Sequence, residues 1–155
     1  MPEISAGLLL YRLKGREVEV FLVHPGGPFW AAKDLGVWSI PKGLVEGKED
    51  LLATAMREFK EETGFTASAP FIPLTPVKLR SGKIVHAWAG EGDYDPALMR
   101  SNLFTIEWPP GSGRRREYPE ADRGAWFTLE DAKQRISTGQ QGFLEELAKL
   151  LFGNP

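Results

Sequence analysis

Short apolar runs separated by Gly, Pro and polar residues predict a series of β-strands in this chain. β-Branched and aromatic residues fill positions 4–12 and 18–23 on either side of a polar turn, so we expect a β-hairpin there. The next loop, residues 25–30, contains Phe29 and Trp30, which are candidates for stacking on a base. The later apolar runs predict three more strands, at residues 37–40, 71–80 and 83–89, the last two joined by a turn at Ser81 and Gly82.

Helical spacing of apolar residues predicts three helices. Residues 50–63 form the clearest one, and Gly64 is placed to end it. Residues 109–124 are expected to be a polar loop, followed by a last strand at Trp126 and Phe127. The second helix should begin at Thr128, whose hydroxyl can cap it, and the third covers residues 141–152.

Length and composition favour one folded unit that mixes α and β structure. At 155 residues, the chain has the size of a single domain, and we expect that domain to span residues 1–155. Gly and Pro together number 29, which agrees with many short elements joined by turns. No internal repeat or long linker divides the sequence.

Charge and residue usage exclude several classes of protein. Nineteen basic against 21 acidic residues give a net charge of −2, so the chain lacks the cationic field that holds DNA, and any anionic ligand must be bound locally. The absence of cysteine excludes disulfides, zinc ribbons and cysteine nucleophiles. The N-terminal region has no basic segment, and its apolar run is too short to span a membrane. We therefore expect a cytoplasmic protein without a membrane partner.

One charged segment stands out from the rest of the chain. Gly43 is followed after five residues by Glu49, and after seven more by a run from Arg57 to Phe65 that contains further acidic residues. Within a helix, Glu58 is three residues from Glu61 and four from Glu62, so the three carboxylates project from one side and repel one another. A divalent cation such as Mg²⁺, which prefers carboxylate and phosphate oxygens, would relieve that repulsion.

A charged helix face is usually only a solvated surface, but the complete pattern argues against this simpler interpretation here. Seven specified residues at about 6–7% usage each match by chance at roughly one in 10⁸ starting positions. Residues 43–65 resemble the Nudix box, the signature of the Nudix hydrolase family, at every glycine and charged position. Phe59 and Phe65 occupy positions that are usually aliphatic. The resemblance implies an α/β/α sandwich with a mixed β-sheet.

The resemblance also implies a reaction and a set of roles. Nudix hydrolases cleave a nucleoside diphosphate linked to another group, with Mg²⁺ or Mn²⁺ as cofactor. Carried onto this chain, Glu58, Glu61 and Glu62 would lie at the metal, and Glu61 would also take part in catalysis. Arg57 would orient a carboxylate, and Glu49 would be a supporting acid or a base. The metal ligands implied in this way are Glu58, Glu61 and Glu62.

Family members often carry another acidic residue in a loop before a late Trp-containing strand, and Glu120 is similarly placed before Trp126. It is our candidate for a further metal ligand or the general base. Glu107 and Asp122 are alternatives for the same role.

Substrate identity is less constrained by the sequence. Lys42, just before the box, resembles the lysine of the dinucleoside polyphosphate and diphosphoinositol branches and is a candidate for binding phosphate. Arg114 and Arg115 begin a basic cluster that ends at Arg116 and could close over a polyphosphate or an RNA 5′ end. The downstream markers of the diadenosine and ADP-ribose branches are missing.

We therefore expect a small nucleotide as substrate, either a dinucleoside polyphosphate or a nucleoside triphosphate. The alternatives are a diphosphoinositol polyphosphate or RNA 5′-pyrophosphate hydrolase, and a Nudix domain that senses nucleotides without cutting them. The sequence makes no prediction of oligomeric state.

Overall fold

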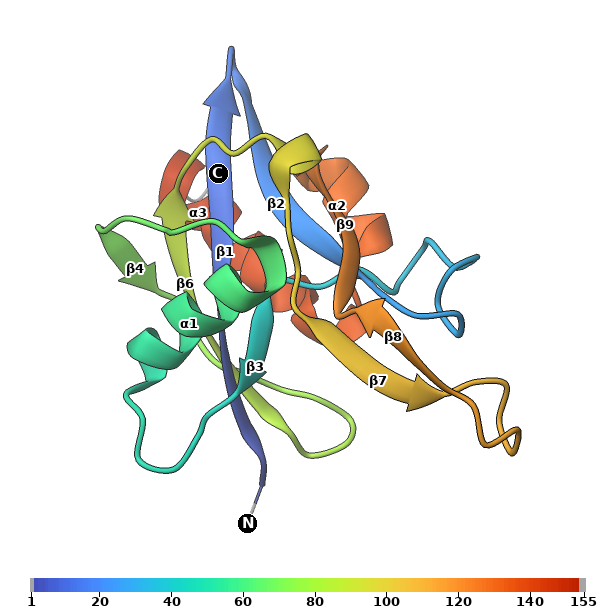
Figure 1. Cartoon of the computed structure of the whole chain (residues 1–155). Helices are drawn as coiled ribbons and strands as arrows, with labels where there is room; N and C mark the ends of the chain where they lie inside the picture. Colours follow the sequence, from blue (N-terminus) through green and yellow to red (C-terminus); the bar gives the residue numbers. More distant parts are fainter. Residues whose placement is uncertain (1, 154–155) are drawn as a thin grey trace.

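The computed structural model describes residues 2–153 and shows a mixed β-sheet with helices on both of its faces (Figure 1). Five strands follow the order β4-β6-β1-β2-β9, while β3 pairs with β1 and β5 pairs with β6. The β1–β6 pair is parallel, and every other strand pair is antiparallel. The strands of this sheet are β1 (Ile4–Lys14), β2 (Glu17–Pro25), β3 (Lys42–Leu44), β4 (Phe71–Pro73), β5 (Val77–Lys78), β6 (Ile84–Glu91) and β9 (Ala121–Thr128).

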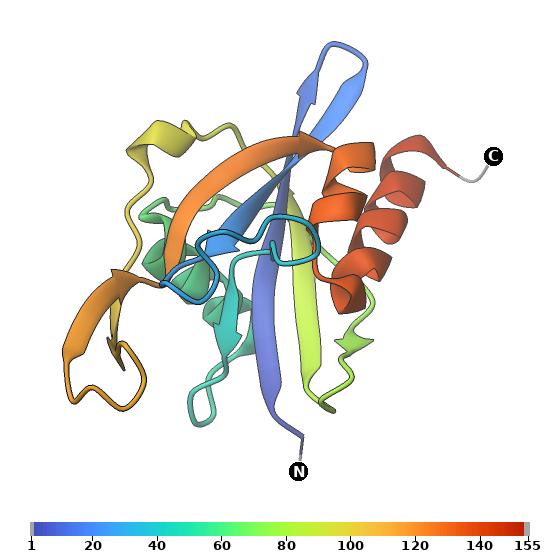
Figure 2. The ribbon, with the colours of Figure 1, turned by 90° about the vertical axis from the view of Figure 1, so that its right-hand side faces the viewer.

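Alternating side chains of β1 supply the two cores between which the sheet lies. Leu8 and Leu10 pack with helix α1 (Leu51–Thr63) on one face. Leu9 packs on the other face, where the helices α2 (Leu129–Arg135) and α3 (Gln141–Phe152) lie. Figure 2 shows α2 and α3 side by side on the face of the sheet away from α1. The expected α/β/α sandwich is therefore confirmed. Two short 3₁₀ helices, η1 (Pro96–Leu98) and η2 (Thr138–Gln140), complete the elements.

A separate two-stranded ribbon extends from this sandwich. Strands β7 (Leu103–Glu107) and β8 (Arg115–Pro119) pair only with each other, and the hairpin projects away from the body (Figures 1 and 2). Among the described residues, neither hydrophobic cluster includes a side chain from this hairpin.

The helix predictions are confirmed by the capping contacts. The Asp50 side chain accepts a hydrogen bond from the Ala53 amide at the start of α1, and Gly64 ends the helix with a left-handed backbone (φ 80°). Thr128 caps α2 by accepting from the Asp131 amide at 3.2 Å. No helix within residues 2–153 is both long and apolar enough to cross a membrane.

Two strand predictions need correction. Residues 37–40 form only isolated bridges, between Val23 and Ser39 and between Trp38 and Ile136. The segment lies between β1 and β2 where these strands no longer pair: Ser39 exchanges backbone hydrogen bonds with Val23, and the Leu8 amide donates to the Pro41 carbonyl. The single strand predicted for residues 71–80 is two short strands, β4 and β5. The intervening segment contains Pro76, whose backbone has no N–H to donate.

The loop predicted for residues 109–124 is only partly a loop. The second half of this segment contains β8 and the first residues of β9. Strand β7, which pairs with β8, was not predicted from the sequence. The sequence of β8 is polar and is therefore typical of a loop. The hairpin lies outside both cores, so its strands lack the hydrophobic alternation of a strand with one buried face.

Candidate functional site

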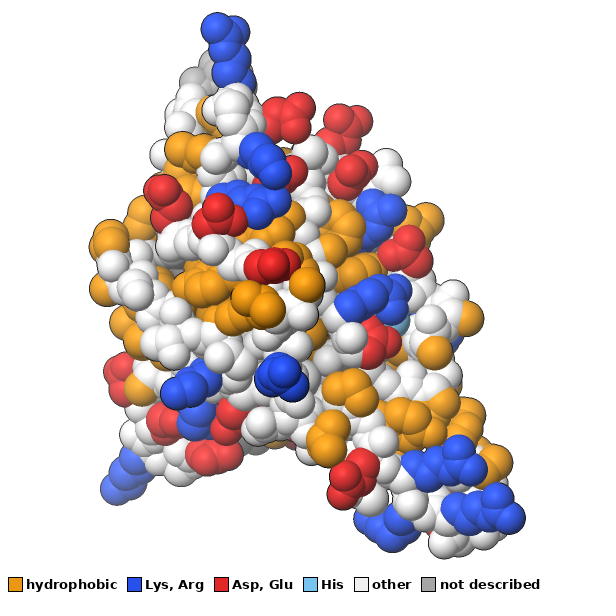
Figure 3. Space-filling view, turned by 45° about the horizontal axis from the view of Figure 1, so that its top comes forward, with side chains coloured by type: hydrophobic (Ala, Val, Ile, Leu, Met, Phe, Trp, Pro, Cys, Tyr) orange, Lys and Arg blue, Asp and Glu red, His pale blue; other side chains and the backbone are white. Residues whose placement is uncertain are grey.

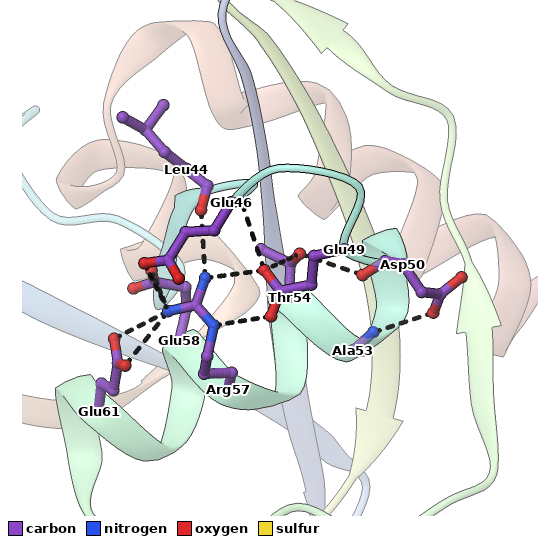
Figure 4. Close-up of polar contacts among 9 residues, drawn as sticks. All are labelled: Leu44, Glu46, Glu49, Asp50, Ala53, Thr54, Arg57, Glu58 and Glu61. Atoms are coloured by element: carbon purple, nitrogen blue, oxygen red, sulfur yellow. Dashed lines mark hydrogen bonds and ion pairs between the residues drawn. The ribbon is translucent and has the colours of Figure 1, made fainter.

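Arg57, in the middle of α1, joins most of the acidic residues of the box (Figure 4). Its guanidinium donates to both carboxylate oxygens of Glu49, at 2.8 and 2.9 Å, and to the Leu44 carbonyl at 3.2 Å. The same group donates through Nη1 to Glu58 at 3.0 Å and to Glu61 at 3.2 Å. A single cation therefore fixes the position of three carboxylates.

Glu49 is held from two sides. Besides the Arg57 contacts, its Oε1 accepts a hydrogen bond from the Thr54 hydroxyl at 2.7 Å. The Arg57 hydrogen bonds, and then the Thr54 bond, lower the pKa of Glu49 to about 2. A carboxylate with such a low pKa is a poor proton acceptor at neutral pH, so the geometry favours Glu49 as the residue that positions Arg57. Thr54 was not singled out from the sequence, where it is one polar residue in the buried stripe of the helix.

Gly43 leaves the space in which Glu58 lies. A Cβ atom at Gly43 would stand 2.0 Å from the Glu58 carboxyl carbon, closer than any real contact. The Glu58 side chain is only 12% exposed. Burial is the main cause that raises its pKa, with repulsion from Glu61 adding to it and Arg57 acting against it.

Glu62 lies deepest in the cluster. Its Oε2 accepts a hydrogen bond from the Lys42 backbone amide at 2.6 Å, which ties the last turn of α1 to β3. Burial raises the pKa of Glu62 to about 8; the Lys42 amide opposes this shift, and repulsion from Glu58 adds to it. Without a cation beside it, this carboxyl group therefore holds a proton at neutral pH.

The single-residue junction between β8 and β9 brings Glu120 to the same place. The Asn102 amide donates to the Glu61 carbonyl at 2.8 Å, and the Asn102 carbonyl accepts from the Glu120 amide at 2.8 Å. Burial, and then repulsion from Glu61, raises the pKa of Glu120. Asn102 thus connects α1 to Glu120, a role that no sequence motif indicated.

The two alternatives to Glu120 have other partners. Asp122 pairs with His24 at 3.0 Å and with Arg123 at 3.3 Å. Glu107 lies in the hairpin, where its carboxylate accepts a hydrogen bond from the Gly111 amide. Of the three acids considered from the sequence, Glu120 is the one whose charge acts on the box carboxylates.

The basic candidates lie outside this cluster. Because Gly43 faces α1, the alternation of β3 directs the Lys42 side chain to the opposite face of the sheet. Burial, and then repulsion from Lys83, lowers the pKa of Lys42. Arg114 and Arg115 lie in the exposed hairpin, and the structure does not bring them against the carboxylates.

Glu58, Glu61, Glu62 and Glu120 fit a hard divalent cation by their chemistry. All four offer oxygen ligands. Glu58, Glu62 and Glu120 have a raised pKa, chiefly because they are buried and in addition because neighbouring carboxylates repel them. Within residues 2–153, no three acidic or histidine side chains already stand in a metal-binding arrangement. Glu58 and Glu61 are turned toward Arg57, so they would have to rotate toward an ion.

Several solved structures share this fold. An Ap4A hydrolase from C. elegans in a binary complex aligns with a TM-score of 0.67 over 97% of this chain and 99% of its own, at 22% identity. The NUDIX domain of Shewanella oneidensis NrtR, complexed with ADP ribose, aligns with a TM-score of 0.69 over 97% of this chain and 89% of its own, at 16% identity.

The sequence comparisons agree with this likeness. A Streptomyces rubellomurinus protein named CMP-5'-(N-acetyl-N-hydroxy-3-aminopropyl)phosphonate hydrolase is 28% identical over 107 residues, which are 69% of this chain and 45% of that protein. The match thus spans less than half of the relative. The family profile described as NUDIX domain matches residues 1–147. The chain therefore belongs to the NUDIX domain family.

Proposed function

We propose that this protein is a divalent-metal-dependent hydrolase that cleaves a phosphoanhydride bond in a nucleotide. The observation that carries the proposal is the convergence of Glu58, Glu61, Glu62 and Glu120. Within residues 2–153, Arg57 is the one cation that pairs with any of them, and it contacts only Glu58 and Glu61. Such a concentration of negative charge is unfavourable in an empty site. It becomes favourable when a cation and a polyphosphate complete the charge balance.

The proposed ligands of Mg²⁺ or Mn²⁺ are Glu58, Glu61 and Glu62. A bound divalent ion would neutralise the pyrophosphate charge and lower the pKa of a water molecule. The side chains around the ligands would hold them in place. Arg57 orients Glu58 and Glu61, and Glu49 orients Arg57.

Glu120 is the proposed general base. Its raised pKa makes it a better proton acceptor than Glu49, whose pKa is about 2. In the described part of the chain, no ion pair engages its carboxylate, so it is available to take a proton from an attacking water.

For the substrate, we propose a dinucleoside polyphosphate or a nucleoside triphosphate. The names of the relatives support a nucleotide: one acts on Ap4A, one was solved with ADP ribose, and one is a hydrolase of a CMP phosphonate. Lys42, Arg114 and Arg115 stay predicted substrate-binding residues, although Lys42 would have to act from the opposite face of β3.

Product analysis tests the proposal directly. Wild-type protein is incubated with dinucleoside polyphosphates, nucleoside triphosphates, ADP-sugars and 5′-triphosphorylated RNA, with Mg²⁺ or with chelator. We expect Glu62→Gln to lower turnover by at least about 10²-fold while the thermal unfolding of the protein stays cooperative, because it removes a ligand and no core group. The matched control is Glu130→Gln, an exposed acid on α2. Metal-independent cleavage, or full activity of Glu62→Gln, would refute the assignment. Binding without cleavage across the panel would favour a nucleotide sensor.

A further inference from the structure

The β7–β8 hairpin is attached to the body at the carboxylate cluster. Asn102, the residue before β7, bonds to the Glu61 carbonyl, and Glu120 directly follows β8. The ribbon forms its own sheet and supplies no side chain to either core. An isolated hairpin is only marginally stable in water, and core packing does not account for the position of this one beside the carboxylate cluster.

The strand register sorts the hairpin side chains onto two different faces. Directly paired residues share a face, and the pairs are Phe104 with Tyr118 and Ile106 with Arg116. The Trp108 amide donates to the Arg114 carbonyl at 2.9 Å, which extends the ladder and places these two residues on the same face. We call this the aromatic face; its residues are Phe104, Ile106, Trp108, Arg114, Arg116 and Tyr118.

The opposite face has a different character. It carries Thr105 paired with Glu117, and Glu107 paired with Arg115. That face therefore carries two acids and one arginine, whereas the aromatic face carries two arginines and no acid. Within residues 2–153, none of the three hairpin arginines forms an ion pair, so the two faces differ only in which residues they carry. Figure 3 shows hydrophobic side chains gathered at the hairpin with Lys and Arg side chains beside them.

The loop after β2 approaches the same part of the hairpin. The Gly26 amide donates to the Glu120 carbonyl at 2.9 Å, and a Cβ atom at Gly27 would lie 3.0 Å from the Phe104 ring. Farther along this loop, Phe29 is 58% exposed and the Lys33 ammonium lies 4.2 Å from the centre of its ring. Aromatic and cationic side chains therefore lie along two segments next to Glu120, the β7–β8 hairpin and the loop after β2.

We propose that the aromatic face binds the nucleotide portion of the substrate that lies beyond the cleaved anhydride, namely the second nucleoside of a dinucleoside polyphosphate and the phosphate next to it. The proposal rests on the proposed function. Aromatic rings stack on bases without regard to sequence, and arginine pairs with phosphate oxygens. Arg116 and Arg114 lie four and six residues from Glu120, or about 13 and 20 Å along an extended strand. These positions suit a ligand that continues well past the bond being cut.

A long RNA suits this surface less well. Two unpaired arginines on one face, with Glu107 and Glu117 on the other, form a short basic patch and no continuous track. The net charge of −2 gives no further support for binding a long polyanion.

The test compares Arg114→Gln/Arg116→Gln with Arg16→Gln, a control that removes an exposed arginine from the turn between β1 and β2, outside the hairpin. Each protein is assayed with diadenosine tetraphosphate, ATP and a 5′-triphosphorylated oligoribonucleotide. Binding of diadenosine tetraphosphate and ATP is also measured by calorimetry in chelator, so that the readout does not depend on turnover. We expect the double variant to raise KM and Kd for diadenosine tetraphosphate about tenfold or more, with kcat unchanged and the ATP values unchanged. Arg16→Gln should match wild type throughout.

Several outcomes would overturn the proposal. Equal losses with ATP and diadenosine tetraphosphate would mean that the face binds a portion common to both. A loss confined to the oligoribonucleotide would identify RNA as the occupant. An equal effect of Arg16→Gln would show that the loss follows from net charge and not from the aromatic face. If wild-type protein cleaves none of the substrates, the proposed function fails, while the calorimetric comparison still decides whether the face binds a second nucleoside.

Discussion

Replacing Gly43 by alanine tests whether the position of Glu58 controls the site. The new Cβ atom would stand 2.0 Å from the Glu58 carboxyl carbon and 2.2 and 2.3 Å from its oxygens. Gly43 does not have a left-handed backbone, so alanine is compatible with β3 itself. The clash is therefore with the end of one flexible side chain, and the carboxylate should move while the strand stays in place.

The size of the effect follows from that displacement. To reach an ordinary contact, the Glu58 carboxyl group must withdraw by at least about 1.4 Å, and a misplacement of about 1 Å already costs about 10²-fold in rate. Displacing one ligand should also weaken Mn²⁺ binding by about 10–100-fold, comparable to the loss of a supporting partner at a metal site. Thermal unfolding should change little, because the carboxylate can turn toward solvent.

The assay is Mn²⁺ titration by calorimetry, together with turnover of the substrate identified in the product analysis and thermal unfolding in chelator. Gly142→Ala is the control, because a Cβ atom there meets only Val77 at 3.7 Å, an ordinary contact. If Gly43→Ala binds Mn²⁺ and turns over as wild type does, Glu58 is not a ligand in the arrangement described. If it fails to fold, the strand is less tolerant than the geometry indicates.

Two further predictions concern the charged cluster. In chelator, the free energy of unfolding should fall as pH rises from 4.5 to about 8, because Glu62 keeps its proton in the folded protein and releases it in the unfolded chain. Glu62 alone contributes a slope of up to about 1.4 kcal/mol per pH unit. Glu62→Gln should flatten the profile measured by denaturant unfolding, and an unchanged slope would contradict the burial of Glu62. Second, Glu49→Gln and Arg57→Gln should each lower kcat at least tenfold, and the double variant no further than the more severe single one, because Glu49 acts through Arg57. Additive losses in a kinetic double-mutant cycle would show that Glu49 has a separate role.

Helix α1 could be predicted almost to the residue because its signals are local. Asp50 and Gly64 cap it through contacts within one turn, and Phe59 lies fully buried at the spacing that the sequence shows. Phe65, the second aromatic residue at a box position that is usually aliphatic, is also packed: it stacks on Tyr94 with ring centres 4.9 Å apart. The box pattern likewise indicated which carboxylates share one side of the helix.

The parts that escaped prediction depend on distant partners. Whether residues 37–40 become a strand depends on how Ser39 meets Val23, and that pairing leaves no periodic pattern in the sequence. In the hairpin, Arg114 and Arg116 occupy the same face as apolar residues, so the alternation that identifies a half-buried strand is lost. Asn102 contributes only its backbone to the site, and a backbone contact has no residue signature.

The single residue between β8 and β9 has a consequence for how such a protein can diversify. Because neither core includes a hairpin side chain, the part of the ribbon beyond Phe104, which lies against Gly27, can change in length and sequence without disturbing the packing of the body. Glu120 stays fixed by the backbone bonds of Gly26 and Asn102, both of which lie outside the hairpin strands. Selection can therefore act on the ribbon and on the hydrolytic centre as two independent modules, so that new ligands are acquired while the inherited chemistry is kept.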